Sequence, residues 1–262
     1  KTKANYLIAA CEMQLGRHER ALSIVNETLS LPNRIIESKQ IAEMSLIGAL
    51  CCTYLHHFDR ATTLFRDAEK GFTAENNELG RLRVLGNMGM LLRQKGDLAE
   101  SRTQYDKAVQ LAIFLGDRPR EGLHRMNRAT VAQTACNYAD AYEDYLAALD
   151  ITEILGNSFR TAQVEVNLAD LLVDMGQGAQ AAKIASRALK RCRQISQERL
   201  ETRALLAAGR AALAAGHRRR RRGRVRLWRV PLEVRATAYH AGRLVARSYA
   251  RALAQGGDYN GR

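Results

Sequence analysis

Three asparagines stand forty residues apart in the sequence, at Asn87, Asn127 and Asn167. Asparagine is a mediocre helix residue, so three of them in register within helix-forming sequence call for an explanation. An amide side chain offers two hydrogen-bond donors and one acceptor, which can pair with a peptide group. A ladder of such amides could grip the backbone of a bound peptide. Alternatively, each amide hydrogen-bonds within its own repeat or to the adjacent repeat.

Further side chains lie one helical turn from these asparagines and would share their face, because residues three and four apart are neighbours on a helix. Arg83, Arg203 and Arg210 could each pair bidentately with a carboxylate of a bound peptide, or remain solvated surface charges. The predicted peptide-binding groove comprises Arg83, Asn87, Met90, Asn127, Thr130, Gln163, Asn167, Asp170, Arg203 and Arg210.

The sequence contains none of the catalytic motifs GxxxxGK[ST], HExxH and GxSxG. His56 and His57 are adjacent, so they point to different sides of a helix and do not easily share a metal. The five cysteines form no CxxC motif and no Cys/His cluster, which is typical of small buried thiols in a reducing compartment. They are Cys11, Cys51, Cys52, Cys136 and Cys192. We therefore expect no enzymatic activity, no metal and no cofactor in this segment.

Most of the net charge of +14 lies at the carboxyl-terminal end, where residues 217–262 contain 13 Arg, no Lys and two acids. The predicted basic patch comprises Arg218, Arg219, Arg220, Arg221, Arg222 and Arg224. Such a block attracts phosphate and acidic groups, which indicates nucleic acid, acidic lipid or an acidic protein as partner, or a nuclear address. Trp228 stands alone, so base stacking has little support. The alternative is an exposed, charged end of a repeat array.

The elements that would position these residues recur every forty residues. A turn column reads Gly16, His56, Gly96, Cys136, Gly176, Gly216 and Gly256. Glycine recurs there because a turn between antiparallel helices often needs a positive φ. Beyond each turn come a small, a bulky and a small residue on one helical face, at Ser101, Tyr105 and Ala108 in the third copy. The preceding helix carries a small-residue column at Ala9, Ala49, Gly89, Ala129, Ala169 and Gly209.

In Gly89, Gly96-Asp97, Ser101, Tyr105 and Ala108 the chain resembles the tetratricopeptide repeat family. The usual unit of that family has about 34 residues. The longer unit here, and the linker Leu115-Gly116-Asp117 with its echo Leu155-Gly156-Asn157, resemble kinesin light chains and Rap-type regulators.

This resemblance implies an all-α fold, a right-handed α-solenoid of stacked antiparallel helix pairs with a concave inner face. It also implies that Asn87, Asn127 and Asn167 contact a bound peptide. The large aromatic that the family places early in the first helix of each pair is missing. That column reads Asn5, Ser45, Leu85, Arg125, Glu165 and Leu205, so packing there should be weaker or differently arranged.

We expect the solenoid to occupy residues 1–216, followed by an Arg-rich tail of residues 217–262. The expected units are about 1–34, 35–75, 76–117, 118–157, 158–196 and 197–230, with helices near 3–15, 18–30, 36–54, 58–73, 78–94, 98–114, 120–134, 138–155, 159–175, 178–195 and 198–215. A seventh first helix is expected at about 232–255; the alternative is a disordered tail. Because the chain begins at Lys1 rather than Met, we expect it to be an excerpt of a longer protein.

The sequence therefore predicts a protein–protein interaction scaffold or adaptor that binds a peptide segment of a partner in the groove of the solenoid. One alternative is a nucleic-acid or acidic-partner binder that acts through the Arg-rich tail. Another is a sensory or autoinhibitory arm of a larger multidomain regulator. There is no secretory signal and no apolar run of about 18 residues, so we expect a cytoplasmic protein, with the Arg run as a nuclear address as the alternative.

Overall fold

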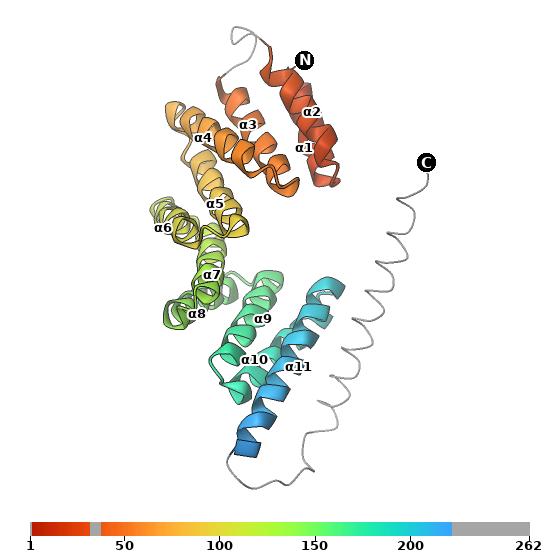
Figure 1. Cartoon of the computed structure of the whole chain (residues 1–262), viewed down its shortest axis with the longest axis vertical. Helices are drawn as coiled ribbons and strands as arrows, with labels where there is room; N and C mark the ends of the chain where they lie inside the picture. Colours follow the sequence, from red (N-terminus) through yellow and green to blue (C-terminus); the bar gives the residue numbers. More distant parts are fainter. Residues whose placement is uncertain (1, 32–37, 222–262) are drawn as a thin grey trace, which may run out of the picture. The chain divides into compact units, whose positions relative to one another are not determined.

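The structure, a computed structural model, describes residues 2–31 and 38–221, and within these ranges all regular secondary structure is helical (Figure 1). The chain divides into two units, Lys1–Ala135 and Cys136–Arg262. None of the helices in the described residues combines the length and the apolar character needed to cross a membrane.

Unit 1 contains seven described helices, in which each helix packs against the next one along the chain. They are α1 (Thr2–Gln14), α2 (His18–Leu29), α3 (Ser38–Tyr54), α4 (Phe58–Ala74), α5 (Glu78–Lys95), α6 (Leu98–Phe114) and α7 (Arg118–Thr134). The odd-numbered helices also contact one another in succession, so they form one layer, and the even-numbered helices form the other. This arrangement is the predicted stack of antiparallel helix pairs.

Unit 2 continues the same pattern with four described helices, α8 (Tyr138–Ile154), α9 (Ser158–Asp174), α10 (Gly178–Gln194) and α11 (Glu198–Arg221). Here α9 packs against α8, α10 and α11, and α10 packs against α11. In both units the first helix of a pair is odd-numbered and the second is even-numbered.

The turns between helices repeat every twenty residues, at a residue with positive φ. The predicted turn column has this conformation at Gly16, Gly96 and Gly176, and also at the non-glycine residues His56 (φ 59°) and Cys136 (φ 60°). At Gly16, His56, Gly96 and Gly176 the helix ends with the hydrogen bonds of a Schellman motif; for example, the Asp97 N–H donates to the Leu92 carbonyl at 2.9 Å. A second series with positive φ, between the pairs, comprises Asn76, Gly116, Gly156 and Ser196.

The turn expected at Gly216 is wrong, because α11 runs without interruption from Glu198 to Arg221. Glycine permits a left-handed turn but does not impose one, and the arginines that follow Gly216 are good helix formers. The expected seventh helix at 232–255, the turn at Gly256, and Arg222 and Arg224 of the basic patch lie outside the described residues.

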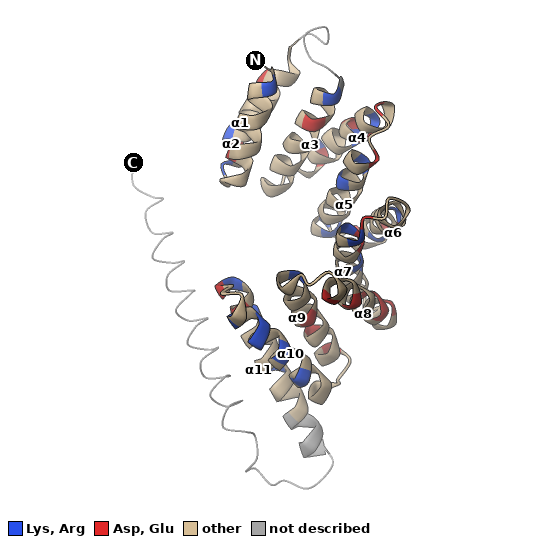
Figure 2. Ribbon diagram, turned by 180° about the vertical axis from the view of Figure 1, so that it is seen from behind, with Lys and Arg blue, Asp and Glu red and all other residues tan. Residues whose placement is uncertain are grey.

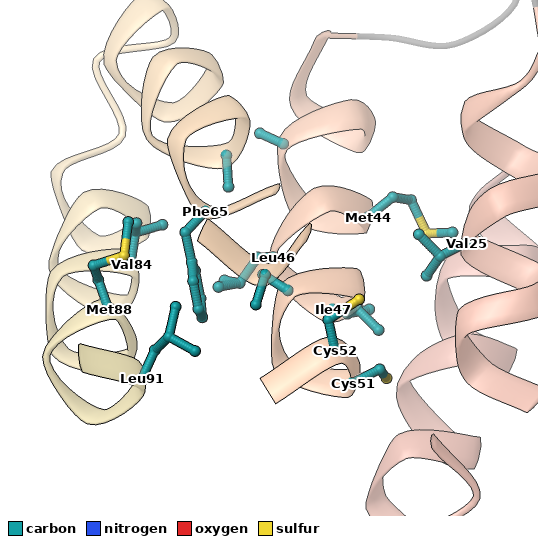
Figure 3. Packing of buried hydrophobic residues seen from close by; sticks show 14 of the residues in the cluster. Val25, Met44, Leu46, Ile47, Cys51, Cys52, Phe65, Val84, Met88 and Leu91 are labelled. Atoms are coloured by element: carbon teal, nitrogen blue, oxygen red, sulfur yellow. The ribbon is translucent and has the colours of Figure 1, made fainter. Parts of the chain in front are cut away.

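The core of the first units follows the small–bulky–small pattern (Figure 3). Phe65 of α4 is fully buried and inserts between Leu46 of α3 and the side chains of Val84 and Leu91 on α5. Bulky residues of the second helix thus join consecutive pairs, and the small residues on either side let the helices approach closely.

The same geometry recurs in the pair α5–α6. The Ser101 hydroxyl donates to the Gly89 carbonyl at 2.7 Å, which ties α6 to α5 in the interior. A Cβ atom at Gly89 would lie 2.9 Å from the ring of Tyr105, so the glycine makes room for that ring. Burial raises the pKa of Tyr105 to about 12.

The column that lacks the family's aromatic is filled by buried leucine in some repeats and by polar contacts in others. Asn5 donates to the Thr28 hydroxyl at 3.0 Å, whereas Leu85 and Leu205 are simply buried. Glu165 is fully buried and forms ion pairs with Arg187 and Arg191 of α10. The column is therefore differently arranged, with polar pairs replacing aromatic packing at some positions.

Candidate functional site

A surface pocket of about 160 Å³ lies in unit 1 between the first helices α5 and α7. It is lined by Arg83, Gly86, Asn87, Met90, Arg120, Leu123, His124 and Asn127. Four of these, Arg83, Asn87, Met90 and Asn127, belong to the predicted groove. The structure thus brings together the part of the groove that the third and fourth repeats contribute.

The two asparagines of the pocket differ in what they offer to a ligand. The Asn87 side-chain amide donates to the Arg83 carbonyl of its own helix at 2.8 Å, so its nitrogen is engaged within the protein. Asn127 is half-buried, and within the described residues its amide has no hydrogen-bond partner. Asn127 is therefore the amide with both donors and acceptor available.

Both arginines of the pocket are held by acids of the protein. The Arg83 guanidinium donates to the Glu43 carboxylate of α3 at 2.9 and 3.1 Å, across exactly one repeat of forty residues. Arg120 forms an ion pair with Asp117, the residue that caps the start of α7. Burial alone would raise the pKa of Asp117, but the hydrogen bonds from the Arg120 backbone N–H and guanidinium hold it below its usual value.

His124 forms an inner wall of the pocket and is 5% exposed. Its Nδ1 is buried without a hydrogen-bond partner, and its ring lies 6.3 Å from that of Tyr105. Burial, with a smaller contribution from the Arg120 charge, lowers its pKa to about 4. The imidazole is therefore neutral at physiological pH and adds a polar but uncharged surface.

The remaining predicted residues on α7 and α9 are partly engaged inside the protein. The Thr130 hydroxyl donates to the Met126 carbonyl at 3.0 Å. The Gln163 amide oxygen accepts from Arg160 at 2.9 Å.

In unit 2 the predicted residues on α9 and α11 pair with one another. Arg203 donates to the Asn167 amide oxygen at 2.7 Å. Arg210 donates to Asp170 at 2.5 Å and to Asp174 at 3.0 Å. Arg83, Arg203 and Arg210 thus all have acceptors within the protein. Their pairing with a carboxylate of a bound peptide stays a prediction.

Four pocket residues were not predicted, namely Gly86, Arg120, Leu123 and His124. A signal was present in the repeat register. His124 interrupts a column that otherwise reads Ala4, Met44, Val84, Val164 and Ala204. Gly86 interrupts a column that otherwise reads Tyr6, Leu46, Met126, Val166 and Leu206. Across the described ranges, no group of three or more His, Cys, Asp and Glu side chains is placed to hold a metal ion.

With this geometry established, comparison with known proteins gives one family. Residues 80–154, which include α5, α6, α7 and α8, match the tetratricopeptide repeat family. This family match is limited to residues 80–154 of the chain. No curated protein matches the chain in sequence.

Solved structures of tetratricopeptide repeats share the fold at low identity. A signal transduction ATPase with numerous domains from Pyrococcus horikoshii, with a tetratricopeptide repeat sensor, is 17% identical, with a TM-score of 0.73 over 81% of this chain. This chain spans only 32% of that protein. The Rap conjugation gene regulator of plasmid pLS20, in complex with the Phr* peptide, is 14% identical, with a TM-score of 0.63, and 93% of this chain and 74% of that one are covered.

A kinesin light chain with nearly identical repeats from Podosopora anserina is 12% identical, with a TM-score of 0.50, and 94% of this chain and 96% of that one are covered. The expected similarity to Rap-type and kinesin light chain repeats is confirmed at the level of the fold.

Proposed function

We propose that this tetratricopeptide repeat chain is a non-enzymatic interaction module that binds a peptide segment of a partner protein. The observation that carries the proposal is the pocket between α5 and α7, where the unpartnered amide of Asn127 stands beside the apolar side chains of Met90 and Leu123. An amide can pair with a peptide group while a neighbouring pocket takes an apolar side chain. The Rap regulator with the same fold was solved with a peptide, which supports this choice.

The electrostatics of the pocket favour certain peptides. The acids Glu43 and Asp117 neutralise Arg83 and Arg120, and His124 is uncharged at neutral pH. The side chain that enters the pocket should therefore be apolar, with polar contacts made by the peptide backbone. A cationic side chain is disfavoured, because burial, the largest cause of the lowered pKa of His124, penalises a positive charge at this wall of the pocket.

The test is selection of binders from a random peptide library on the full chain, followed by titration of the best peptide. Asn127→Ala should weaken binding by about tenfold or less, since one hydrogen-bonding group is worth about 1 kcal/mol. Gln110→Ala removes an exposed amide on the opposite layer, on α6, and should leave binding unchanged. Selected peptides that bind wild type and Asn127→Ala equally, or that lose affinity only when residues 217–262 are deleted, would overturn the proposal.

A second candidate is a sensory arm of a larger regulator. It is favoured by the similarity to the ATPase with a tetratricopeptide repeat sensor, of which this chain spans about a third. In this case the same pocket would receive a peptide and transmit its binding to another domain. We further propose a cytoplasmic location, which the five free thiols support.

The alternative of nucleic-acid or acidic-partner binding through the Arg-rich tail stays a prediction. Its residues 222–262 lie outside the described ranges. It predicts an affinity that falls steeply with salt and disappears when residues 217–262 are deleted.

A further inference from the structure

The two even-numbered helices of unit 2 carry opposite charges. The charged side chains of α8 are all acidic, at Asp140, Glu143, Asp144, Asp150 and Glu153, whereas those of α10 are all basic, at Lys183, Arg187, Lys190, Arg191 and Arg193. The even-numbered helices of unit 1, α2, α4 and α6, each mix both signs. Figure 2 shows red segments on α8 and blue segments on α10.

These two helices border one continuous surface. The Glu153 carboxylate at the end of α8 reaches Arg187 and Arg191 of α10, at 3.9 and 3.7 Å. The surface of α8 also exposes two apolar side chains, Leu146 (40%) and Ile154 (71%). An acidic helix with exposed apolar side chains is thus linked to a basic helix by the ion pairs at the end of α8.

The exposed charges lie in register across the forty-residue repeat. Glu143 corresponds to Lys183 and Asp150 to Lys190, each pair forty residues apart. All four side chains are exposed, and within the described part of the chain none of the four forms an ion pair with the protein. The charges are therefore available to a partner that presents the opposite signs at the same spacing.

We infer that the α8–α10 face is a self-association surface, and that its partner is a second copy of this chain. A face with equal numbers of acids and bases on neighbouring parallel helices is complementary to itself. A two-fold axis parallel to the helices and midway between them would place α8 of one copy over α10 of the other at the same height. Glu143 then faces the partner's Lys183 and Asp150 faces the partner's Lys190. An axis perpendicular to the helices would instead oppose acid with acid.

The size of the face sets the strength of the association. Each helix has 17 residues and is therefore about 26 Å long. Two such helices side by side offer roughly 500 Å² per copy, which is less than the roughly 800 Å² of a standard interface. The dimer should therefore be weak and dependent on its charges. Because exposed charges are screened, it should dissociate as the salt concentration rises.

The experiment is sedimentation velocity of the full chain at increasing concentrations, in about 0.01 M and about 1 M salt. We expect a monomer–dimer equilibrium in low salt and monomer in high salt. The variant Glu143→Lys/Asp150→Lys and the variant Lys183→Glu/Lys190→Glu should each self-associate about tenfold or more weakly, because each opposes like charges in the dimer. An equimolar mixture of the two should dimerise as well as wild type, because each supplies the sign that the other lacks.

The matched control is Asp67→Lys/Glu100→Lys, which makes the same change of net charge on α4 and α6 of unit 1. It should dimerise like wild type, and circular dichroism should confirm that every variant is folded. A wild-type protein that stays monomeric in low salt, or paired variants that fail to associate when mixed, would overturn the inference.

Discussion

The imidazole of His124 on α7 lies against the backbone of Gly86 on α5, so closely that a Cβ atom at position 86 would be 2.3 Å from its Cε1. The two residues are exceptions in their repeat columns, a glycine in a column of large apolar residues and a histidine in a column of apolar ones. The absence of a side chain at Gly86 makes room for the His124 ring, and both residues line the pocket.

Gly86→Ala should destabilise the protein by about 1–3 kcal/mol, because the added methyl group overpacks a buried contact. The free energy of unfolding in urea measures this effect. In the background of His124→Val, the residue found at the equivalent positions Val84 and Val164, the same substitution should be nearly neutral.

Gly209→Ala on α11 is the matched control for that prediction. A Cβ atom there would meet nothing within 4 Å, so alanine should stabilise the helix by roughly 0.5–1 kcal/mol. Equal effects of the two glycine substitutions would contradict the close contact between Gly86 and His124.

Acid should destabilise the protein through His124. Its pKa is about 4 in the folded protein and 6.5 in the unfolded chain, so between these values the unfolded chain binds a proton that the folded protein excludes. The contribution of His124 to the free energy of unfolding is therefore fully present above pH 6.5 and is lost as the pH drops toward 4. At pH 5 the loss should be about 2 kcal/mol relative to pH 7.

The measurement is urea unfolding at pH 7 and pH 5 for wild type and His124→Val. Subtracting the pH dependence of the variant removes the contributions of the other titrating groups that both proteins share. A pH dependence that is the same in the two proteins would show that the imidazole is not excluded from protonation by burial.

The turns allow a reciprocal test of backbone conformation. His56 has a φ of 59°, a left-handed conformation that costs a non-glycine residue roughly 1 kcal/mol. His56→Gly should therefore stabilise the protein by up to that amount. The gain is reduced by the loss of the edge-to-face contact of His56 with Phe58, whose ring centroids lie 5.5 Å apart. Gly96→Ala, at a φ of 94°, should destabilise by at least as much. Thermal unfolding of both variants measures the two effects, and a change of the same sign in both would contradict this account.

Sequence reasoning predicted the helices closely because the repeat imposes one register on all of them. The turn column at Gly16, Gly96 and Gly176 marks where the helices end, and His56 and Cys136 adopt the same conformation without being glycine. Gly216 shows the limit of the pattern. A single residue type marks a permitted turn, and whether the chain turns there depends on the sequence that follows.

The site was predicted only in part, because a column of equivalent positions does not show which side chains are already paired. Asn127 is available, whereas Asn87 and Asn167 have hydrogen bonds within the protein. The pairing of Arg83 with Glu43 depends on side-chain direction between repeats. In the sequence, Gly86 and His124 are visible only as two departures from apolar columns. That the missing side chain at position 86 makes room for the imidazole is seen only in the three-dimensional packing.

Glu165 is fully buried and forms ion pairs with Arg187 at 2.5 Å and with Arg191 at 3.3 Å. Substituting both arginines by alanine leaves a buried carboxylate without a counter-charge and should cost about 3–5 kcal/mol. Glu165→Leu should be close to neutral, because Leu85 and Leu205 occupy the same column and are buried in their own units. Arg187 and Arg191 are partly exposed and can be solvated once the acid is gone. Urea unfolding of the two variants measures both changes. The free energy of unfolding should fall more in the variant without the two arginines, because that variant leaves a buried, unpaired carboxylate. A larger fall in Glu165→Leu would contradict this account.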